Sequence, residues 1–179
     1  MKRFEPDFYA QNIFSIDVSF YKKHGIKCVL SDLDNTLDAF DKLEPSKRVI
    51  DLKNKLNKEG IELVIVSNNK EKRKGIYCTL LGVKGIFSCR KPFKKRISLF
   101  IKKLNYRKEE VILVGDQLLT DVQCGKNAKI KVILTEPIVK KDQWTTKFNR
   151  LIDKPIRKHL KNKGYLESVR ITNGQEWFY

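Results

Sequence analysis

Two aspartates lie two positions apart in the segment SDLDNTL, directly after a short apolar run. In an extended backbone, side chains at positions i and i+2 point to the same side, so Asp32 and Asp34 can address one small volume. Two like charges at this separation need a cation or a shared proton between them. The pair therefore predicts a site that handles a metal ion, a proton or both.

Three further segments carry groups that suit the same chemistry. The segment SNN offers the Ser67 hydroxyl, the Asn68 amide and the free N–H groups of a helix start, which together suit a phosphate. The segment RKP brings the cation Lys91, and GDQLLTD adds the carboxylates of Asp116 and Asp121. Carboxylate oxygens from several loops, completed by waters, are the ligands that Mg²⁺ takes.

Each of these segments has an ordinary explanation when it is taken alone. An Asp-x-Asp pair is common in solvated turns, Ser-Asn-Asn can simply cap a helix, and Lys-Pro can form a surface turn. The case for a catalytic site therefore depends on whether the fold brings the four segments together.

Short apolar runs alternate with amphipathic charged stretches along the chain, which is typical of a βαβ protein. We expect strands at 26–30, 61–66, 83–87, 111–114 and 130–134, and helices at 45–59, 69–81, 93–104 and 119–127. The strand runs are almost continuously apolar, so they fit a parallel sheet covered on both faces. The predicted fold is a single Rossmann-like, doubly wound α/β domain. Ligands bind such sheets beyond the carboxyl ends of the strands, and each of the four segments directly follows an expected strand.

The segments DLDNTL, VSNN, KP and GDQLLTD resemble the four motifs of the haloacid dehalogenase (HAD) superfamily. More closely, GIKCVLSDLDNTL, VSNNKEKR, RKP, GDQLLTDV and TKFNR resemble the YqeG-like family, in subfamily IIIA of the HAD phosphatases, over nearly the whole chain. The resemblance implies the HAD fold and a Mg²⁺-dependent phosphatase. It also implies that Asp32 is the nucleophile and Asp34 the general acid and base, while Ser67, Asn68 and Lys91 bind the substrate phosphate.

The same resemblance implies a metal site. Its Mg²⁺ ligands would be Asp32, Asp116 and the backbone carbonyl of Asp34, with Thr36 and Asp121 as supporting residues. Attack by a carboxylate divides the hydrolysis of a phosphomonoester into two easier displacements through an aspartyl phosphate. We therefore expect a phosphomonoester hydrolase with Mg²⁺ as its cofactor.

The spacing of the motifs leaves no room for a sizeable cap domain, since 32 residues lie between Asp34 and Ser67 and 23 between Ser67 and Lys91. For uncapped HAD enzymes, the resemblance implies macromolecules, lipid head groups or substrates presented at a surface. The YqeG-like family is similar to the HAD phosphatidylglycerophosphate phosphatases, so that lipid, at an anionic membrane surface during phosphatidylglycerol synthesis, is the leading substrate. Cations flank the second and third motifs and favour such a surface: Lys70, Lys72, Arg73, Lys74, Arg90, Lys94, Lys95 and Arg96.

The 179-residue chain carries 38 Lys and Arg against 21 Asp and Glu, and the resulting net charge of +17 favours anionic partners. It does not choose among phosphorylated substrates, membrane and nucleic acid. No stretch reaches the roughly 18 apolar residues of a membrane span, and the first residues lack the apolar region of a signal peptide. We expect a cytoplasmic protein, with peripheral attachment to the inner face of the membrane as an option. The four cysteines show no C-x-x-C spacing and are expected to be reduced core thiols rather than metal ligands or disulfides.

We divide the chain into a phosphatase core with an N-terminal extension, 1–139, and a basic amphipathic helical tail, 140–179. Between 140 and 163 the tail has nine Lys and Arg against two Asp. Its apolar residues recur near helical spacing: Phe148, Leu151, Ile152, Ile156 and Leu160. We expect a helix, bent or restarted at Pro155, that packs on the domain, lies on a membrane surface or contacts nucleic acid.

Three functions remain open from the sequence. The first is the lipid phosphatase, and the second is a phosphatase for a soluble phosphoester, a phosphoprotein or a nucleic-acid end. The third is an RNA- or ribosome-associated binding protein in which the motifs are vestigial. The intact motifs and the lack of an RNA-binding signature weigh against the third. Nothing in the sequence indicates an oligomeric state.

Overall fold

The structure is a computed structural model. It describes residues 1–179 apart from 1, 140–143, 168–170, 173–174 and 177–179, and apart from the side chains of 71–73, 144–148 and 168–179. Phe148, Lys72 and Arg73, which the sequence singled out, therefore have side chains outside the described set.

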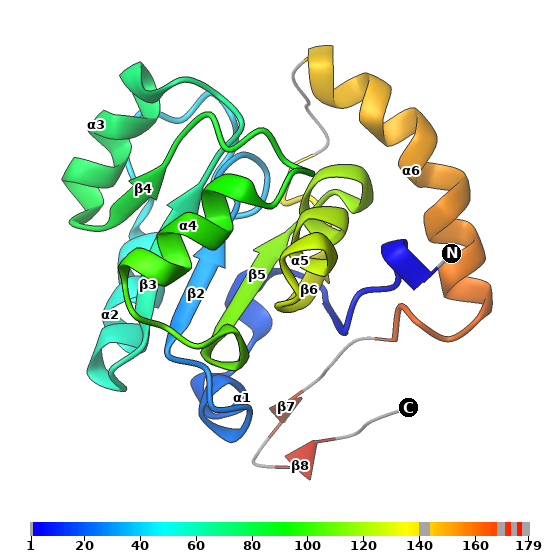
Figure 1. The fold of residues 1–179 in the computed structure, drawn as a ribbon, viewed down its shortest axis with the longest axis horizontal. Helices are drawn as coiled ribbons and strands as arrows, with labels where there is room; N and C mark the ends of the chain where they lie inside the picture. Colours follow the sequence, from blue (N-terminus) through cyan, green and yellow to red (C-terminus); the bar gives the residue numbers. More distant parts are fainter. Residues whose placement is uncertain (1, 140–143, 168–170, 173–174, 177–179) are drawn as a thin grey trace.

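A six-stranded parallel sheet in the order β1-β6-β5-β2-β3-β4 forms the centre of the protein (Figure 1). Its strands are β1 (Phe8–Ala10), β2 (Cys28–Ser31), β3 (Glu62–Val66), β4 (Lys84–Ile86), β5 (Val111–Gly115) and β6 (Lys131–Thr135). Five of them match the predicted strands to within two residues, so the predicted doubly wound fold is confirmed. A separate antiparallel pair near the end of the chain is formed by β7 (Ile171–Thr172) and β8 (Gln175–Glu176).

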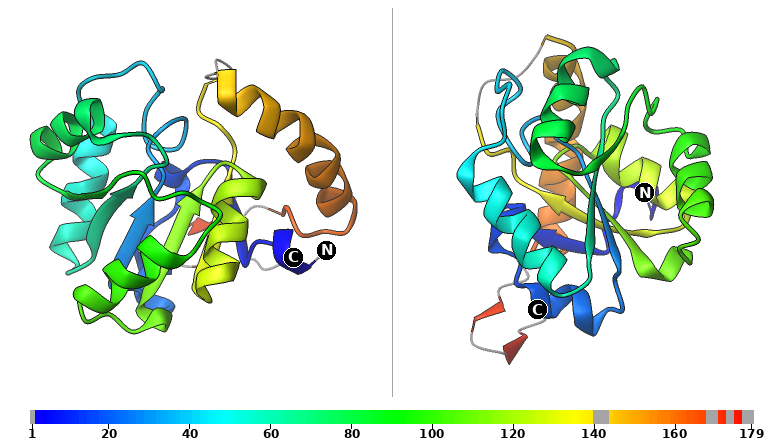
Figure 2. Two further views of the ribbon diagram at one scale, coloured as in Figure 1. Left: turned by 45° about the horizontal axis from the view of Figure 1, so that its top comes forward. Right: turned by 90° about the vertical axis from the view of Figure 1, so that its left-hand side faces the viewer.

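Helices cover both faces of the sheet, as Figure 2 shows. Their bounds are α1 (Val18–Lys23), α2 (Lys47–Lys58), α3 (Glu71–Leu81), α4 (Lys95–Lys103), α5 (Gln123–Ala128) and α6 (Trp144–Asn162), with short helical turns η1 (Lys2–Phe4), η2 (Ile13–Ser15), η3 (Lys108–Glu110) and η4 (Leu118–Val122). One apolar core joins α1, α2 and α3 to one face of the sheet, and a second joins α4 and α5 to the other. Alternate residues of β2 enter the two cores, Val29 the first and Leu30 the second, which explains why the strand reads as continuously apolar.

The edge strand β1 was not predicted. It lies in the segment that the sequence suggested as an N-terminal extension, and it pairs in parallel with β6 from Phe8 opposite Ile133 to Ala10 opposite Thr135. Three residues are too few to display a strand period, and the pairing partner lies more than a hundred positions away. The extension therefore adds a strand to the sheet and, through α1, part of one covering layer.

The predicted helix at 119–127 is divided in the structure. It begins as η4, a π-helical turn, and continues as α5. Gly125 lets α5 approach the sheet, because a Cβ atom there would lie 2.1 Å from Val132 Cγ2. Because η4 continues directly into α5, the close packing of α5 on β6 also holds η4 in place. The short loop that contains Asp116 comes immediately before η4.

No separate cap domain is present among the described residues; the chain between β2 and α2 is a loop. Within the same residues, none of the helices combines the length and apolarity that a bilayer crossing requires. All four cysteines are free and buried, as predicted for core thiols. Burial raises the pKa of Cys89 to about 11, so this thiol is protonated at neutral pH.

Helix α6 runs continuously through Pro155 and does not restart there. Leu160 is buried in the core beside η1, and Ile156 packs against the same core. Leu151 is 68% exposed and Ile152 is also exposed, so these two members of the predicted apolar stripe do not face the domain. The face of α6 that meets the domain is instead largely polar, as the contacts at the site show.

We expect Gly125→Ala to destabilise the protein by about 1–3 kcal/mol, because the added methyl group has no space between α5 and β6. Urea unfolding of the purified variant measures this, with Gln123→Ala, at a partly exposed position of the same helix, as the control. Equal stability of the two variants would contradict the close packing of α5.

Candidate active site

The four polar segments meet at the carboxyl edge of the sheet because β2 lies between β5 and β3. Ser31, the last residue of β2, stands opposite Val114 of β5 and Ile65 of β3. The loops after these three strands therefore start at nearly the same level. Asp32 follows at once, and its backbone N–H donates to the Val114 carbonyl at 2.9 Å. The predicted convergence of the motifs is thus a direct result of strand register.

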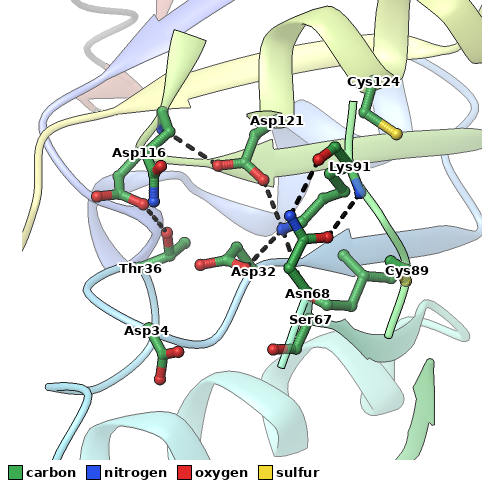
Figure 3. Close-up of polar contacts among 12 residues, drawn as sticks. Asp32, Asp34, Thr36, Ser67, Asn68, Cys89, Lys91, Asp116, Asp121 and Cys124 are labelled. Carbon is green, nitrogen blue, oxygen red and sulfur yellow. Dashed lines mark hydrogen bonds and ion pairs between the residues drawn. The ribbon is translucent and has the colours of Figure 1, made fainter. Parts of the chain in front are cut away.

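The Lys91 ammonium group joins two carboxylates in the interior of the site (Figure 3). Its Nζ atom lies 2.6 Å from Asp32 Oδ1 and 2.6 Å from Asp121 Oδ1, and it also donates to the Val66 carbonyl at 3.4 Å. These three acceptors match the three protons of an ammonium group. The two aspartates and Lys91 are all buried, so the ion pairs form where water screens them little.

The Asn68 side chain holds the backbone of Lys91 rather than pointing into open space. Its Oδ1 atom accepts from the Lys91 N–H at 2.6 Å, and its Nδ2 donates to the Lys91 carbonyl at 3.0 Å. The neighbouring Ser67 hydroxyl is buried and accepts from the Asn69 N–H at 3.2 Å. Asn68 therefore positions Lys91 in this structure, and the phosphate contacts expected of Ser67, Asn68 and Lys91 stay predictions.

Asp116, the first residue after β5, is fully buried and has a partner on each oxygen. Thr36 Oγ1 donates to its Oδ1 atom at 3.2 Å, and the supporting role expected of Thr36 stays a prediction. Arg150 Nη2 of α6 lies 2.5 Å from its Oδ2 atom. Burial raises the pKa of Asp116, and Arg150 opposes that shift more than any other group.

Asp121 lies on η4 and is also fully buried. Its Oδ2 atom accepts from the Gln117 N–H at 3.1 Å, and its Oδ1 atom binds Lys91. Gly115 makes room for it, because a Cβ atom at that position would lie 2.3 Å from Asp121 Cγ. Burial raises the pKa of Asp121, while Lys91 lowers it. For Lys91 itself, burial lowers the pKa, but Asp121 and Asp32 outweigh burial and raise it above the ordinary value.

Asp34 differs from the other three aspartates in its surroundings. Its side chain is partly exposed, pairs with Lys74 and accepts from Asn69 Nδ2 at 3.1 Å. Figure 3 shows the Asp34 carboxylate pointing away from that of Asp32. Lys74, which the sequence placed among the surface cations, is buried, so it belongs to the site rather than to the outer rim.

The arrangement fits a hard divalent cation. Asp32, Asp116 and Asp121 each offer a carboxylate oxygen, and these three atoms lie within 4.8 Å of one another. Oxygen ligands of this kind suit Mg²⁺, which fills its remaining positions with water. The predicted ligands Asp32 and Asp116 are therefore together, and Asp121, predicted to support the loop, joins them as a third carboxylate.

Several residues at the site were not anticipated. Arg150, Asp153 and Arg157 reach the loop after β5 from α6. Their spacing of three and four along the helix was visible in the sequence, as was the TKFNR segment that contains Arg150. The apolar residues of the same helix also recur at helical spacing, and they suggested that a different face of α6 meets the domain.

We expect Lys91→Met to destabilise the protein by about 3–5 kcal/mol, because it leaves Asp32 and Asp121 without their shared cation in a buried site. Lys94→Met, at an exposed position nearby, should change stability by less than about 0.5 kcal/mol. Urea unfolding with and without Mg²⁺ measures both, and added Mg²⁺ should restore part of the loss in Lys91→Met. If the two variants were equally stable, the buried ion pairs would not hold the site together.

The chain is 36% identical over 166 residues to the probable phosphatase YqeG of Bacillus subtilis, covering 93% of this chain and 96% of that protein. Among solved structures, it resembles the cobalt-bound deoxy-D-mannose-octulosonate 8-phosphate phosphatase YrbI of Haemophilus influenzae, with a TM-score of 0.50, 17% identity and coverage of 65% of this chain and 81% of that one.

A hypothetical protein from Xanthomonas campestris gives a TM-score of 0.51 at 16% identity, over 74% of this chain and 79% of that one. These two structural likenesses support the fold alone. A family model described as haloacid dehalogenase-like hydrolase matches residues 10–135, which span strands β2 to β6 and all four motifs. The chain therefore belongs to the haloacid dehalogenase-like hydrolases and, by its identity to YqeG over nearly its whole length, to the YqeG-like phosphatases among them.

Proposed function

We propose that this phosphatase is a Mg²⁺-dependent phosphomonoester hydrolase that forms an aspartyl phosphate on Asp32. The observation that carries the proposal is the position of Asp32. It follows the central strand, is bound by Lys91 at 2.6 Å, and offers an oxygen within 4.8 Å of those of Asp116 and Asp121. A carboxylate positioned at the head of the site beside the Lys91 ammonium group is a competent nucleophile toward phosphorus.

The chain's own residues account for the two displacements. The Asp32 carboxylate attacks phosphorus, and the bond from phosphorus to the leaving oxygen breaks, which gives an acyl phosphate and an alcohol. We assign to Asp34 the protonation of the leaving oxygen, for which its side chain must turn from Lys74 toward Asp32. Asp34 then accepts a proton from the water that attacks the intermediate, and the bond from phosphorus to Asp32 breaks to release phosphate. Lys91 stabilises the charge on the transferred group. A bound Mg²⁺, held by Asp32, Asp116 and the Asp34 carbonyl, would neutralise further phosphoryl charge.

Phosphatidylglycerophosphate at a membrane surface is the substrate that we propose. The absence of a cap domain from the described residues leaves the site accessible to a head group that stays in its bilayer. Exposed cations lie after β3 and β4, among them Lys70, Arg90 and Lys94. Two large apolar side chains are also exposed on loops at the carboxyl edge, with Leu43 61% and Phe93 70% exposed. Basic and apolar groups together suit an anionic bilayer surface.

The test is phosphate release from phosphatidylglycerophosphate in liposomes, with an aryl phosphate as a second substrate. We expect the wild type to release phosphate from the lipid in the presence of Mg²⁺, and EDTA to abolish release. Asp32→Asn removes the nucleophile at nearly constant shape and should lower the rate at least about a thousandfold. Lys108→Gln, an exposed residue at the opposite edge of the sheet, is the matched control and should keep full activity.

The outcomes separate the remaining functions. Hydrolysis of the aryl phosphate alone, dependent on Asp32, would keep the mechanism and remove the lipid in favour of a soluble phosphoester, a phosphoprotein or a nucleic-acid end. Inertness toward both substrates under conditions where the protein is folded would contradict the catalytic proposal. It would favour a binding protein, for which the net charge of +17 is the supporting feature.

A further inference from the structure

Helix α6 reaches the loop after β5 through polar side chains at helical spacing. Asp153 Oδ2 accepts from the Leu118 N–H at 2.9 Å. Arg157 Nη2 donates to the Asp116 carbonyl at 2.6 Å. Arg150 is two turns before Arg157 on the same helix, and its guanidinium meets the Asp116 carboxylate at 2.5 Å. The helix therefore holds the backbone of this loop and separately places one cation on its buried acid.

Arg150 and Arg157 form a natural pair for comparison. Both are largely buried, with 15% of each side chain exposed, and both contact Asp116. Arg157 binds the Asp116 and Thr135 carbonyls and pairs with Glu136, so its charge has its own partner outside the carboxylate cluster. Arg150 pairs with an acid of the cluster itself. Comparing variants of the two residues therefore distinguishes the anchoring of α6, to which Arg157 contributes, from the charge that Arg150 brings to the carboxylate cluster.

The charges of the site show what Arg150 changes. Within the carboxylate cluster, Asp32, Asp116 and Asp121 face Lys91 and Arg150, which leaves one net negative charge. The buried Asp153 carboxylate, which interacts with Arg157 and Arg150, lies outside this cluster and is the same with and without a bound cation. A divalent cation would turn the charge of the cluster into one net positive charge, which attracts a phosphate dianion. Without Arg150, the same site would start with two net negative charges and be neutral once the cation had bound. Because these groups are buried, such differences act with little screening.

We propose that Arg150 sets the charge of this site, so that it weakens binding of the divalent cation and strengthens binding of the phosphate that follows. The inference rests on the proposed function, since it takes Asp116 as a cation ligand. By linkage, a cation that Arg150 opposes must itself weaken the contact between Arg150 and Asp116. Docking of the first turns of α6 and cation binding therefore compete.

A residue that only positioned Asp116 would behave differently. Its loss would let the carboxylate move and would weaken cation binding and, through it, phosphate binding. If Arg150 instead sets the charge, its loss strengthens binding of the cation and weakens binding of phosphate. This opposition separates the proposal from a structural role.

The test measures Mg²⁺ binding to the full chain by titration calorimetry, and then binding of inorganic phosphate to the Mg²⁺-saturated protein. Arg150→Gln keeps a side-chain donor and removes the charge. We expect its Kd for Mg²⁺ to fall about tenfold and its Kd for phosphate to rise about tenfold. Arg150→Lys restores the charge and should bring both constants back toward the wild-type values. Arg157→Gln is the matched control and should not move the two constants in opposite directions.

An unchanged or raised Kd for Mg²⁺ in folded Arg150→Gln would overturn the proposal. A wild type that binds no Mg²⁺ would instead count against the proposed metal dependence, so the two failures are distinguishable.

A second measurement uses the wild type alone and does not depend on the folding of a variant. Hydrogen exchange of the backbone amides of α6 around Arg150 should become faster when Mg²⁺ is added, because the cation weakens the Arg150–Asp116 contact. Slower or unchanged exchange in a protein that binds Mg²⁺ would overturn the proposal.

Discussion

The site depends on holding three carboxylates together in the protein interior. Asp32, Asp116 and Asp121 are buried within reach of one another, and like charges so placed repel strongly unless cations lie among them. Lys91 bridges two of them and Arg150 binds the third. The remaining negative charge is what a divalent cation can neutralise. The same constraint thus accounts for the stability of the site and for its chemistry.

The fold supplies this arrangement through the order of its strands. Because β2 lies between β5 and β3, the loops that begin at Asp32, Ser67 and Asp116 start side by side. The stretch after β4 continues to pair with the segment after β3, as the Cys89 N–H donates to the Ser67 carbonyl at 2.9 Å. Asn68 then fixes the Lys91 backbone. The positions of Asp32, Asp116 and Lys91 therefore follow from strand register and from hydrogen bonds made to the backbone beside them.

Features with local sequence signals were predictable. The apolar runs predicted five strands, and Asp32, Asp34, Lys91 and Asp116 each follow a strand end, so both the fold and the meeting of the motifs could be inferred. Features that depend on partners far away in the sequence were not predictable. Strand β1 is an example, because its three residues show no strand period and its partner β6 lies more than a hundred positions later.

The role of α6 was hidden for a similar reason. Its apolar residues suggested an amphipathic face that the structure uses only in part, since Leu151 is exposed and Leu160 is buried. The polar contacts of Asn149, Arg150 and Arg157 join this helix to residues 21 to 41 positions earlier in the chain. Charged residues in a basic helix carry no sign of which one will be buried. Lys74 illustrates the same point, because nothing near it in the sequence distinguishes it from Lys70, which is exposed.

The central claim is that Asp32 carries the phosphoryl group, and the most direct test is to trap that intermediate. A reaction stopped during turnover and treated with borohydride converts an aspartyl phosphate into a homoserine residue, which peptide mass spectrometry can locate. We predict the modification at Asp32 in the wild type, and its absence when substrate or Mg²⁺ is omitted and in Asp32→Asn. Modification of another residue, or none during measurable turnover, would contradict the account.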